Sequence, residues 1–181
     1  MKNMRLYQLL LSILFSFFTL STAFAWNNSI EIGYGYSHDP NNTKYNNSGV
    51  LLSGDIISLK RTPWTFWSIT GSLGQWHSTA PVNQNLTTGA LSLALRLYTF
   101  NIAHSYPFYL LGSAGPAYLS KSKFGLNTQA SHASIQTTLG LGAEFNNIDA
   151  NLRLVHFSNA GLGHINEGFN ILYLLSIGYL F

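Results

Sequence analysis

Residues 135–145, IQTTLGLGAEF, alternate between a bulky set that begins with Ile135 and a small or polar set that begins with Gln136. A period of two places successive side chains on opposite faces of a β-strand. The same alternation recurs in residues 30–36, 91–98 and 169–181. In the last of these segments one face carries Phe169, Ile171, Tyr173, Leu175, Ile177, Tyr179 and Phe181. Less regular segments at 49–61, 64–77, 108–120 and 148–158 bring the expected number of strands to eight.

The composition excludes most soluble classes of protein. Only 8% of the 181 residues are charged, against roughly 25% in ordinary soluble domains. Cysteine is absent, which excludes disulfides and thiolate metal sites. The formal net charge is only +3 and no Lys/Arg run exists, so we expect no nucleic-acid partner. The histidines show no metal-ligand spacing, and no motif predicts a cofactor.

Residues 1–25 have the pattern of a secretory signal peptide. Lys2 and Arg5 supply positive charge, residues 9–20 are almost wholly apolar, and Ala23-Phe24-Ala25 provides a cleavage site. The apolar run is about a dozen residues, short of the roughly 20 that a spanning helix needs. We therefore expect a signal peptide at 1–25 and one domain at 26–181.

The expected domain is apolar, poor in charge and secreted, and it lacks an apolar stretch long enough for a membrane-spanning helix. A closed β-barrel is the structure by which such a chain can lie in a lipid bilayer. A soluble lipocalin-like barrel would point its apolar set inward. Here the alternate set is short and polar and suits a narrow lumen, whereas the bulky set suits lipid. Aromatic residues near the expected strand ends resemble interfacial girdles, among them Trp64, Phe66, Trp76 and Tyr109. The prediction is an all-β, eight-stranded antiparallel transmembrane barrel in the outer membrane of a Gram-negative cell.

The lumen-facing set includes a few charged side chains. Arg96, Glu144, Asp149 and Arg153 all have that parity. We expect them to form a buried ion-pair network that braces the barrel.

Residues 148–158 place two reactive side chains on the lipid-facing parity. Ile148, Ala150, Leu152 and Leu154 continue to His156 and Ser158. With both termini periplasmic, this strand rises toward the cell exterior, and 159–168 is an exterior loop. A polar group on the lipid face is costly and is a functional hypothesis by default. Residues i and i+2 have Cα atoms about 6.5 to 7 Å apart on one face, so the imidazole can take the serine hydroxyl proton.

A catalytic histidine is usually oriented by a third group. Glu167 is the carboxylate that follows Ser158, and unbroken alternation carried back from residue 169 puts it on the same face. Asn159, Asn166 and the backbone N–H groups of 160–161 are candidates for stabilising an oxyanion. The sequence contains a useful comparison, because His132 and Ser134 have the same spacing but the serine has lumen parity. The His-x-Ser spacing alone is therefore weak evidence for a catalytic pair. The lipid-facing parity of His156 and Ser158 and the residues that follow them strengthen the hypothesis.

The motif His156-Phe157-Ser158-Asn159-Ala160-Gly161, followed by Asn166, Gly168 and a strand that ends on an aromatic residue, resembles the lipid A 3-O-deacylase (PagL) family. That resemblance implies an eight-stranded outer-membrane barrel whose His/Ser/Glu triad hydrolyses the ester-linked acyl chain at position 3 of lipid A. It implies Ser158 as nucleophile, His156 as base and Asn159 and Asn166 in the oxyanion region.

One position departs from the family pattern. The family's acid lies at or near the position of Asn170, and this chain has no carboxylate there. Three outcomes follow: Glu167 takes over, Asn170 orients the histidine as a neutral amide, or activity is weak or lost. We favour Glu167 at this point.

The predicted function is therefore a lipid A 3-O-deacylase, a carboxylic ester hydrolase that uses a serine nucleophile and no cofactor or metal. Its partners are lipid A, or lipopolysaccharide, and the outer membrane, and the sequence leaves a homodimer open. The alternatives are a non-catalytic small barrel of the OmpA/OmpX type, with a structural or adhesive role, and a barrel acyltransferase.

Overall fold

The structure is a computed structural model that describes residues 28–39, 42–102, 106–161, 164–165 and 167–181. The expected signal peptide therefore lies outside the described residues. In the part that is described, no helix is both long enough and apolar enough to span a bilayer.

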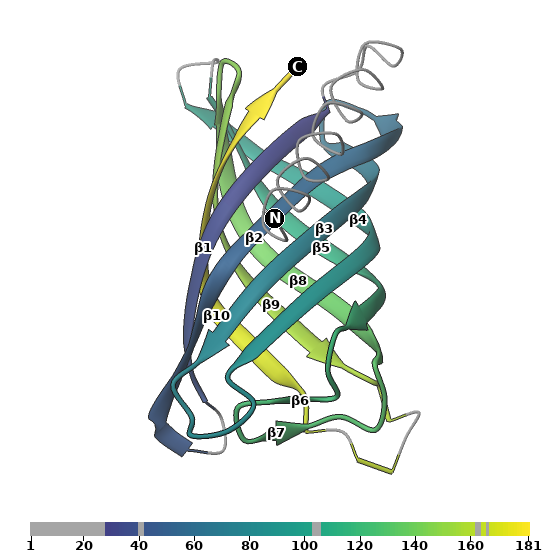
Figure 1. Ribbon diagram of the computed structural model, residues 1–181. Coiled ribbons are helices and arrows are strands. Elements are labelled where there is room, and N and C mark those ends of the chain that lie inside the picture. The colour runs from purple at the N-terminus through teal and green to yellow at the C-terminus, as the bar shows by residue number, and fades with distance from the viewer. Residues whose placement is uncertain (1–27, 40–41, 103–105, 162–163, 166) are drawn as a thin grey trace, which may run out of the picture.

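Eight of the described strands close into one antiparallel barrel, which confirms the predicted fold (Figure 1). The barrel strands are β1 (Ser29–Asp39), β2 (Asn42–Arg61), β3 (Thr65–Ser78), β4 (Asn85–Ile102), β5 (Tyr106–Leu119), β8 (Ala133–Phe145), β9 (Ile148–Ser158) and β10 (Phe169–Leu180). Around the wall the order is β1-β10-β9-β8-β5-β4-β3-β2, and β1 pairs with β2 to complete the ring. Closure leaves the barrel sheet itself without an edge strand.

The two ends of the barrel differ. At one end Ser29 of β1 pairs with Leu180 of β10, and we call this the terminal end. Its turns are short, and β8 passes to β9 through Asn146 and Asn147 alone, where Asn146 has a φ of 55°. A two-residue hairpin of this kind requires positive φ, which asparagine tolerates. The opposite end, which we call the loop end, carries longer connections, including residues 159–168 (Figure 1).

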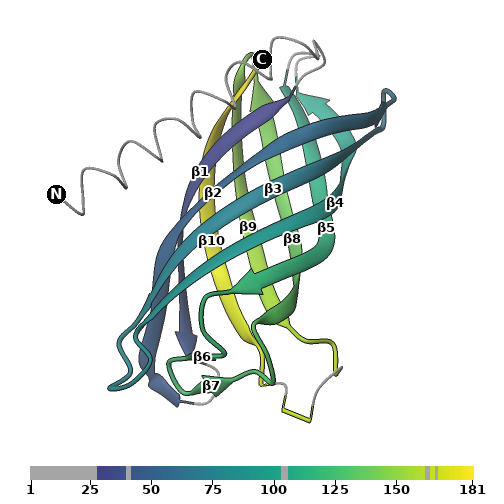
Figure 2. The ribbon, with the colours of Figure 1, turned by 45° about the vertical axis from the view of Figure 1, so that its right-hand side comes forward.

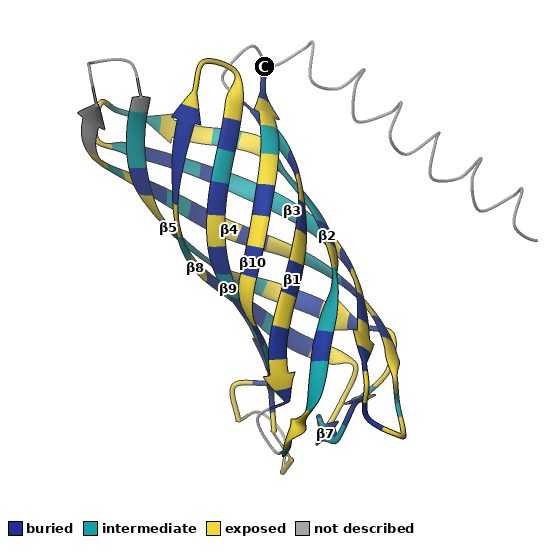
Figure 3. Cartoon of the chain, turned by 90° about the vertical axis from the view of Figure 1, so that its left-hand side faces the viewer, coloured by how far each residue is buried: buried dark blue, intermediate teal, exposed yellow. Residues whose placement is uncertain are grey.

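Burial alternates along the strands as the sequence pattern predicts (Figure 3). In β1, Ser29, Glu31 and Ser37 are buried, whereas Ile32 and Tyr34 are more than half exposed. The small or polar set thus lines the lumen and the bulky apolar set covers the outer wall. Exposed aliphatic and aromatic side chains around a closed barrel are the surface that lipid solvates.

The girdle prediction was wrong for three aromatic residues. Phe66, Trp76 and Tyr109 are at most 1% exposed and lie inside the barrel, while Trp64 is 68% exposed at the terminal end. Trp76 donates its indole N–H to Thr88 Oγ1 at 3.0 Å. Glycines make room for two of these rings, Gly49 and Gly74 beside Trp76 and Gly142 beside Tyr109, so side-chain size alone did not identify the face.

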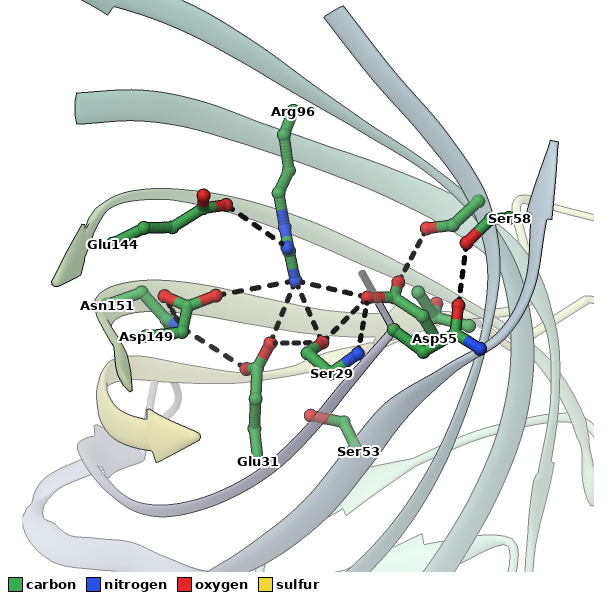
Figure 4. A network of polar contacts seen from close by, with 12 residues as sticks. Ser29, Glu31, Ser53, Asp55, Ser58, Arg96, Glu144, Asp149 and Asn151 are labelled. Atoms are coloured by element: carbon green, nitrogen blue, oxygen red, sulfur yellow. Dashed lines mark hydrogen bonds and ion pairs between the residues drawn. The ribbon is translucent and has the colours of Figure 1, made fainter. Parts of the chain in front are cut away.

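The lumen holds two layers. Toward the terminal end, Arg96 forms ion pairs with Glu31, Asp55, Glu144 and Asp149 (Figure 4). Arg153 adds a further ion pair with Glu31. These contacts confirm the predicted lumen network. Toward the loop end the filling is apolar and includes Leu51, Trp76, Leu86, Phe124, Phe157, Phe169 and Ile171.

A small hairpin closes the loop end. Strands β6 (Lys123–Phe124) and β7 (Asn127–Thr128) lie across that end of the barrel (Figure 2). Phe124 is 2% exposed, and its ring centroid lies 5.1 Å from that of Phe169 in β10. The side chain of Asn127 donates a hydrogen bond to the carboxylate of Asp39 in β1. The hairpin is therefore packed onto the apolar layer.

Strand β10 contains a β-bulge that the alternation did not predict. Ile171 pairs with Val155 and Leu174 pairs with Arg153, so Leu172 and Tyr173 together face the single residue Leu154. An extra residue reverses the alternation on one side of a bulge. Tyr173, Leu175 and Ile177 face outward as expected, but Phe169 and Ile171 are buried in the lumen at 1% and 0% exposure. The expected single face of 169–181 is therefore wrong for its first two members.

Candidate functional site

His156 and Ser158 lie on the outer wall of the barrel, near the loop end of β9. Their neighbours Val155 and Phe157 are buried in the lumen and Asn159 is buried in the loop that follows, whereas His156 and Ser158 are only partly buried. The strand is regular here, since β9 pairs without a break with β8 from Ile135↔Ser158 to Phe145↔Ile148. The structure therefore brings the predicted pair together on the outer face.

Asn170 contacts the imidazole of His156. The two residues are directly paired across β9 and β10, and His156 Nδ1 lies 2.6 Å from Asn170 Oδ1. An amide oxygen only accepts hydrogen bonds, so Nδ1 is the donor in this contact, and in the neutral imidazole Nε2 then presents its lone pair. If His156 is to accept a proton from Ser158 through Nε2, that nitrogen must be unprotonated, which is the tautomer described here. The hydroxyl of Ser37 donates to the carbonyl oxygen of Asn170 at 2.6 Å and holds its backbone against β1.

Glu167 lies elsewhere. Its carboxylate accepts a hydrogen bond from the N–H of Thr128 at 2.6 Å, and its own N–H donates to Thr128 O at 3.1 Å. The expectation that Glu167 meets His156 assumed unbroken alternation back from residue 169. The bulge reverses that alternation, which turns Asn170 outward and leaves Glu167 against the β6–β7 hairpin.

The loop after Ser158 is held by Asn159. Its Nδ2 donates to Ile165 O at 2.8 Å, and its Oδ1 accepts from the N–H of Gly161 at 3.1 Å. The N–H of Ala160 points at Ser158 Oγ from 3.4 Å. Ala160 has a φ of 52°, a conformation that costs an L-residue roughly 1–2 kcal/mol and that concentrates at functional sites. Asn166, the other oxyanion candidate, lies outside the described residues.

Gly168 packs against the ring of His156. A Cβ at this position would lie 3.0 Å from His156 Cε1 and 3.1 Å from the carbonyl oxygen of Phe157, and the residue has a φ of 50°. Both facts favour glycine at this position. The sequence shows Gly168 only as part of the family motif, because its contact with the imidazole depends on where the neighbouring strand lies.

Behind the pair, aromatic packing fixes the wall. The rings of Phe157 and Phe169 are stacked with centroids 4.7 Å apart, and Phe157 stands between His156 and Ser158 in the chain. The hydroxyl of Ser134 donates to the carbonyl oxygen of Ser158 at 2.9 Å. Ser134 belongs to the His132/Ser134 comparison pair, and it has the lumen parity that the sequence predicts.

Comparisons with known proteins agree with the barrel fold and identify a family. The family described as "Lipid A 3-O-deacylase (PagL)" matches residues 52–179. The crystal structure of the outer membrane enzyme PagL is similar, with a TM-score of 0.63 and 18% identity, covering 83% of this chain and 98% of that one. No curated protein sequence matches the chain.

Two other solved barrels align less closely. The Yersinia pestis outer membrane protein Ail, in a phospholipid nanodisc, has a TM-score of 0.46 and 18% identity over 86% of this chain and 99% of that one. The N-terminal β-barrel domain of Pseudomonas aeruginosa OprF has a TM-score of 0.46 and 17% identity over 86% of this chain and 100% of that one. Because the family match covers most of the chain, and the barrel carries a histidine and a serine side by side on its outer wall, this chain belongs to the lipid A 3-O-deacylase (PagL) family of outer-membrane β-barrel hydrolases.

Proposed function

We propose that this chain is an integral outer-membrane enzyme that hydrolyses the ester-linked 3-hydroxyacyl chain at position 3 of lipid A, with Ser158 as nucleophile and His156 as base. The observation that carries the proposal is the outer-wall pair itself, in which the imidazole of His156 is anchored through Nδ1 to Asn170. A substrate that lies in the outer leaflet reaches this wall laterally. A lumen filled by an ion-pair network and an apolar layer supports the same direction of access.

In the first step Ser158 Oγ attacks the ester carbonyl carbon while Nε2 of His156 accepts the hydroxyl proton. The tetrahedral intermediate collapses when its bond to the sugar oxygen breaks, and the protonated imidazole returns the proton to that oxygen as the sugar alcohol leaves. Water then attacks the acyl-Ser158 ester with the same proton relay and releases the 3-hydroxy fatty acid. The N–H of Ala160, aimed at Ser158 Oγ, and the side chain of Asn166 are the proposed oxyanion donors, whereas Asn159, whose Nδ2 already donates to Ile165 O, holds the loop in place.

We assign the orienting role to Asn170 rather than to Glu167. Its amide oxygen holds the ring in the tautomer that leaves Nε2 free, but it carries no charge. A neutral partner stabilises the imidazolium of the transition state less than a carboxylate does. The proposed enzyme is therefore a triad hydrolase with a weaker third member.

Mass spectrometry of lipid A from cells with and without the protein tests the function. The expected result is the loss of one 3-hydroxyacyl unit, which Ser158→Ala and His156→Ala abolish while both variants keep the heat-modifiable migration of a folded barrel. A gain in lipid A mass would instead identify an acyltransferase. Unchanged lipid A, or wild-type activity in either variant, would contradict the proposal and favour a structural barrel of the OmpA/OmpX type.

A further inference from the structure

Residues 123–130, which comprise β6, the turn at 125–126, β7 and the two residues after β7, contact both strands of the proposed site. We call them the mouth segment, since they lie across the loop end of the barrel (Figures 1 and 2). The ring of Phe124 anchors one end of the segment on Phe169 inside the lumen. At its other end the N–H of Ala130 donates to the carbonyl oxygen of Ile165 at 3.0 Å.

The mouth segment contacts β9 through Gln129. This side chain is 4% exposed, and its Nε2 donates to the carbonyl oxygen of Phe157 at 3.2 Å. That carbonyl belongs to the peptide unit that joins Phe157 to Ser158. The hydrogen bond therefore fixes the backbone between the proposed base and the proposed nucleophile.

The mouth segment contacts the start of β10 through Glu167. Thr128 and Glu167 exchange two hydrogen bonds, one from Thr128 N–H to the carboxylate and one from Glu167 N–H to Thr128 O. The chain has six acidic side chains. Five of them are buried, whereas Glu167 is exposed; the buried ones are Glu31, Asp39, Asp55, Glu144 and Asp149.

The Glu167 contact reaches His156 through one intervening residue. Gly168 follows Glu167 directly, and its Cα stands so close to the imidazole that a Cβ there would be 3.0 Å from Cε1. A shift of the Glu167 backbone therefore moves the surface on which the ring rests. In an enzyme, a displacement of about 1 Å at a reacting group costs about 100-fold in rate.

We propose that Glu167 is a positioning residue, which fixes Gly168 and hence the imidazole of His156 by binding the backbone of Thr128 in the mouth segment. This role rests on the proposed hydrolase function. It differs from that of a triad acid, because the carboxylate acts on a backbone N–H rather than on the imidazole.

The test compares three variants of the full chain refolded in detergent micelles, with hydrolysis of lipid A in mixed micelles as the assay. Glu167→Ala removes the acceptor for Thr128 N–H, and we expect kcat to fall about 10- to 100-fold with little change in KM. Glu167→Gln keeps an oxygen acceptor, so we expect it to restore most of the lost rate. Lys121→Ala removes an exposed charge just before the mouth segment and serves as the control, with wild-type kcat.

The pH profile separates positioning from charge. The acid limb of kcat/KM should coincide in the wild type, Glu167→Ala and Glu167→Gln, because the carboxylate does not touch the ring. Wild-type kcat in Glu167→Ala would overturn the proposal. A Glu167→Gln variant as slow as Glu167→Ala, with a displaced acid limb, would also overturn it and make Glu167 the triad acid.

A second readout does not depend on activity. The imidazole resonances of His156, assigned by ¹⁵N labelling and the His156→Ala variant, should move in Glu167→Ala and stay in place in Lys121→Ala. If the wild type fails to hydrolyse lipid A, the proposed function fails, and the resonance shift still decides the positioning role. Unmoved His156 resonances in Glu167→Ala would refute it.

Discussion

Replacing Asn170 by aspartate tests the proposed mechanism most sharply, because it changes one charge and almost no volume. Asn170 Oδ1 lies 2.6 Å from His156 Nδ1, so an aspartate oxygen at the same point accepts the same hydrogen bond. The substitution converts a neutral acceptor into an ionised one. It also places a carboxylate at the position where the family resemblance implies one, although the family's acid is a glutamate.

The expected gain follows from the difference between the two acceptors. A hydrogen bond to a charged group contributes about 1.5–3 kcal/mol, against about 0.5–1.5 kcal/mol for a neutral one. The ring becomes positive only as it accepts the serine proton, so the extra attraction stabilises the transition state more than the ground state. A net gain of about 1.4 kcal/mol corresponds to a rise in kcat of about 10-fold for Asn170→Asp.

The pH dependence provides the second measurement. A carboxylate beside the ring favours the protonated imidazole, which cannot act as a base. The acid limb of kcat should therefore move to higher pH in Asn170→Asp, while the plateau above it rises. The assay is release of 3-hydroxy fatty acid from lipid A in mixed micelles, measured by mass spectrometry from about pH 5 to about pH 9. This range extends about 1.5 pH units below and about 2.5 pH units above the pKa of an unperturbed imidazole.

Asn170→Ala serves as the matched control. It removes the acceptor, leaves the ring free to adopt the wrong tautomer, and should be slower than the wild type. The reasoning is refuted if Asn170→Asp has the wild-type plateau and an unmoved acid limb. It is equally refuted if Asn170→Ala retains full activity, because the contact with His156 would then have no part in the reaction.

Two further predictions concern other residues. Gly168→Ala places a Cβ 3.0 Å from His156 Cε1 and requires alanine to adopt a left-handed φ. We therefore expect kcat to fall by about 10- to 100-fold while the barrel still migrates as folded. Normal activity would show that the imidazole ring does not rest on this glycine. Arg96→Met leaves the buried carboxylates around it without their cation, so we expect the free energy of unfolding in urea to fall by about 3–5 kcal/mol, whereas Lys60→Met, at an exposed position, should leave it unchanged. An equally stable Arg96→Met barrel would contradict the view that the network braces the lumen.

The local sequence was sufficient to predict the barrel. Alternation with a period of two depends only on neighbouring residues. The low content of charged residues indicates that the outer wall of the barrel faces lipid rather than water. Together they identified eight strands and the lumen positions of Arg96, Glu144, Asp149 and Arg153. They also put His156 and Ser158 on the outer wall, because β9 runs without a bulge.

The partner of His156 depended on tertiary structure. Alternation carried back along β10 pointed to Glu167, but the bulge at Leu172 and Tyr173 turned Asn170 outward instead. The bulge is a property of the pairing between β9 and β10, since it allows Phe169 and Ile171 to pack in the lumen beside Phe157. Residues within one strand cannot encode that choice, because it is made by the side chains that meet from other strands inside the barrel.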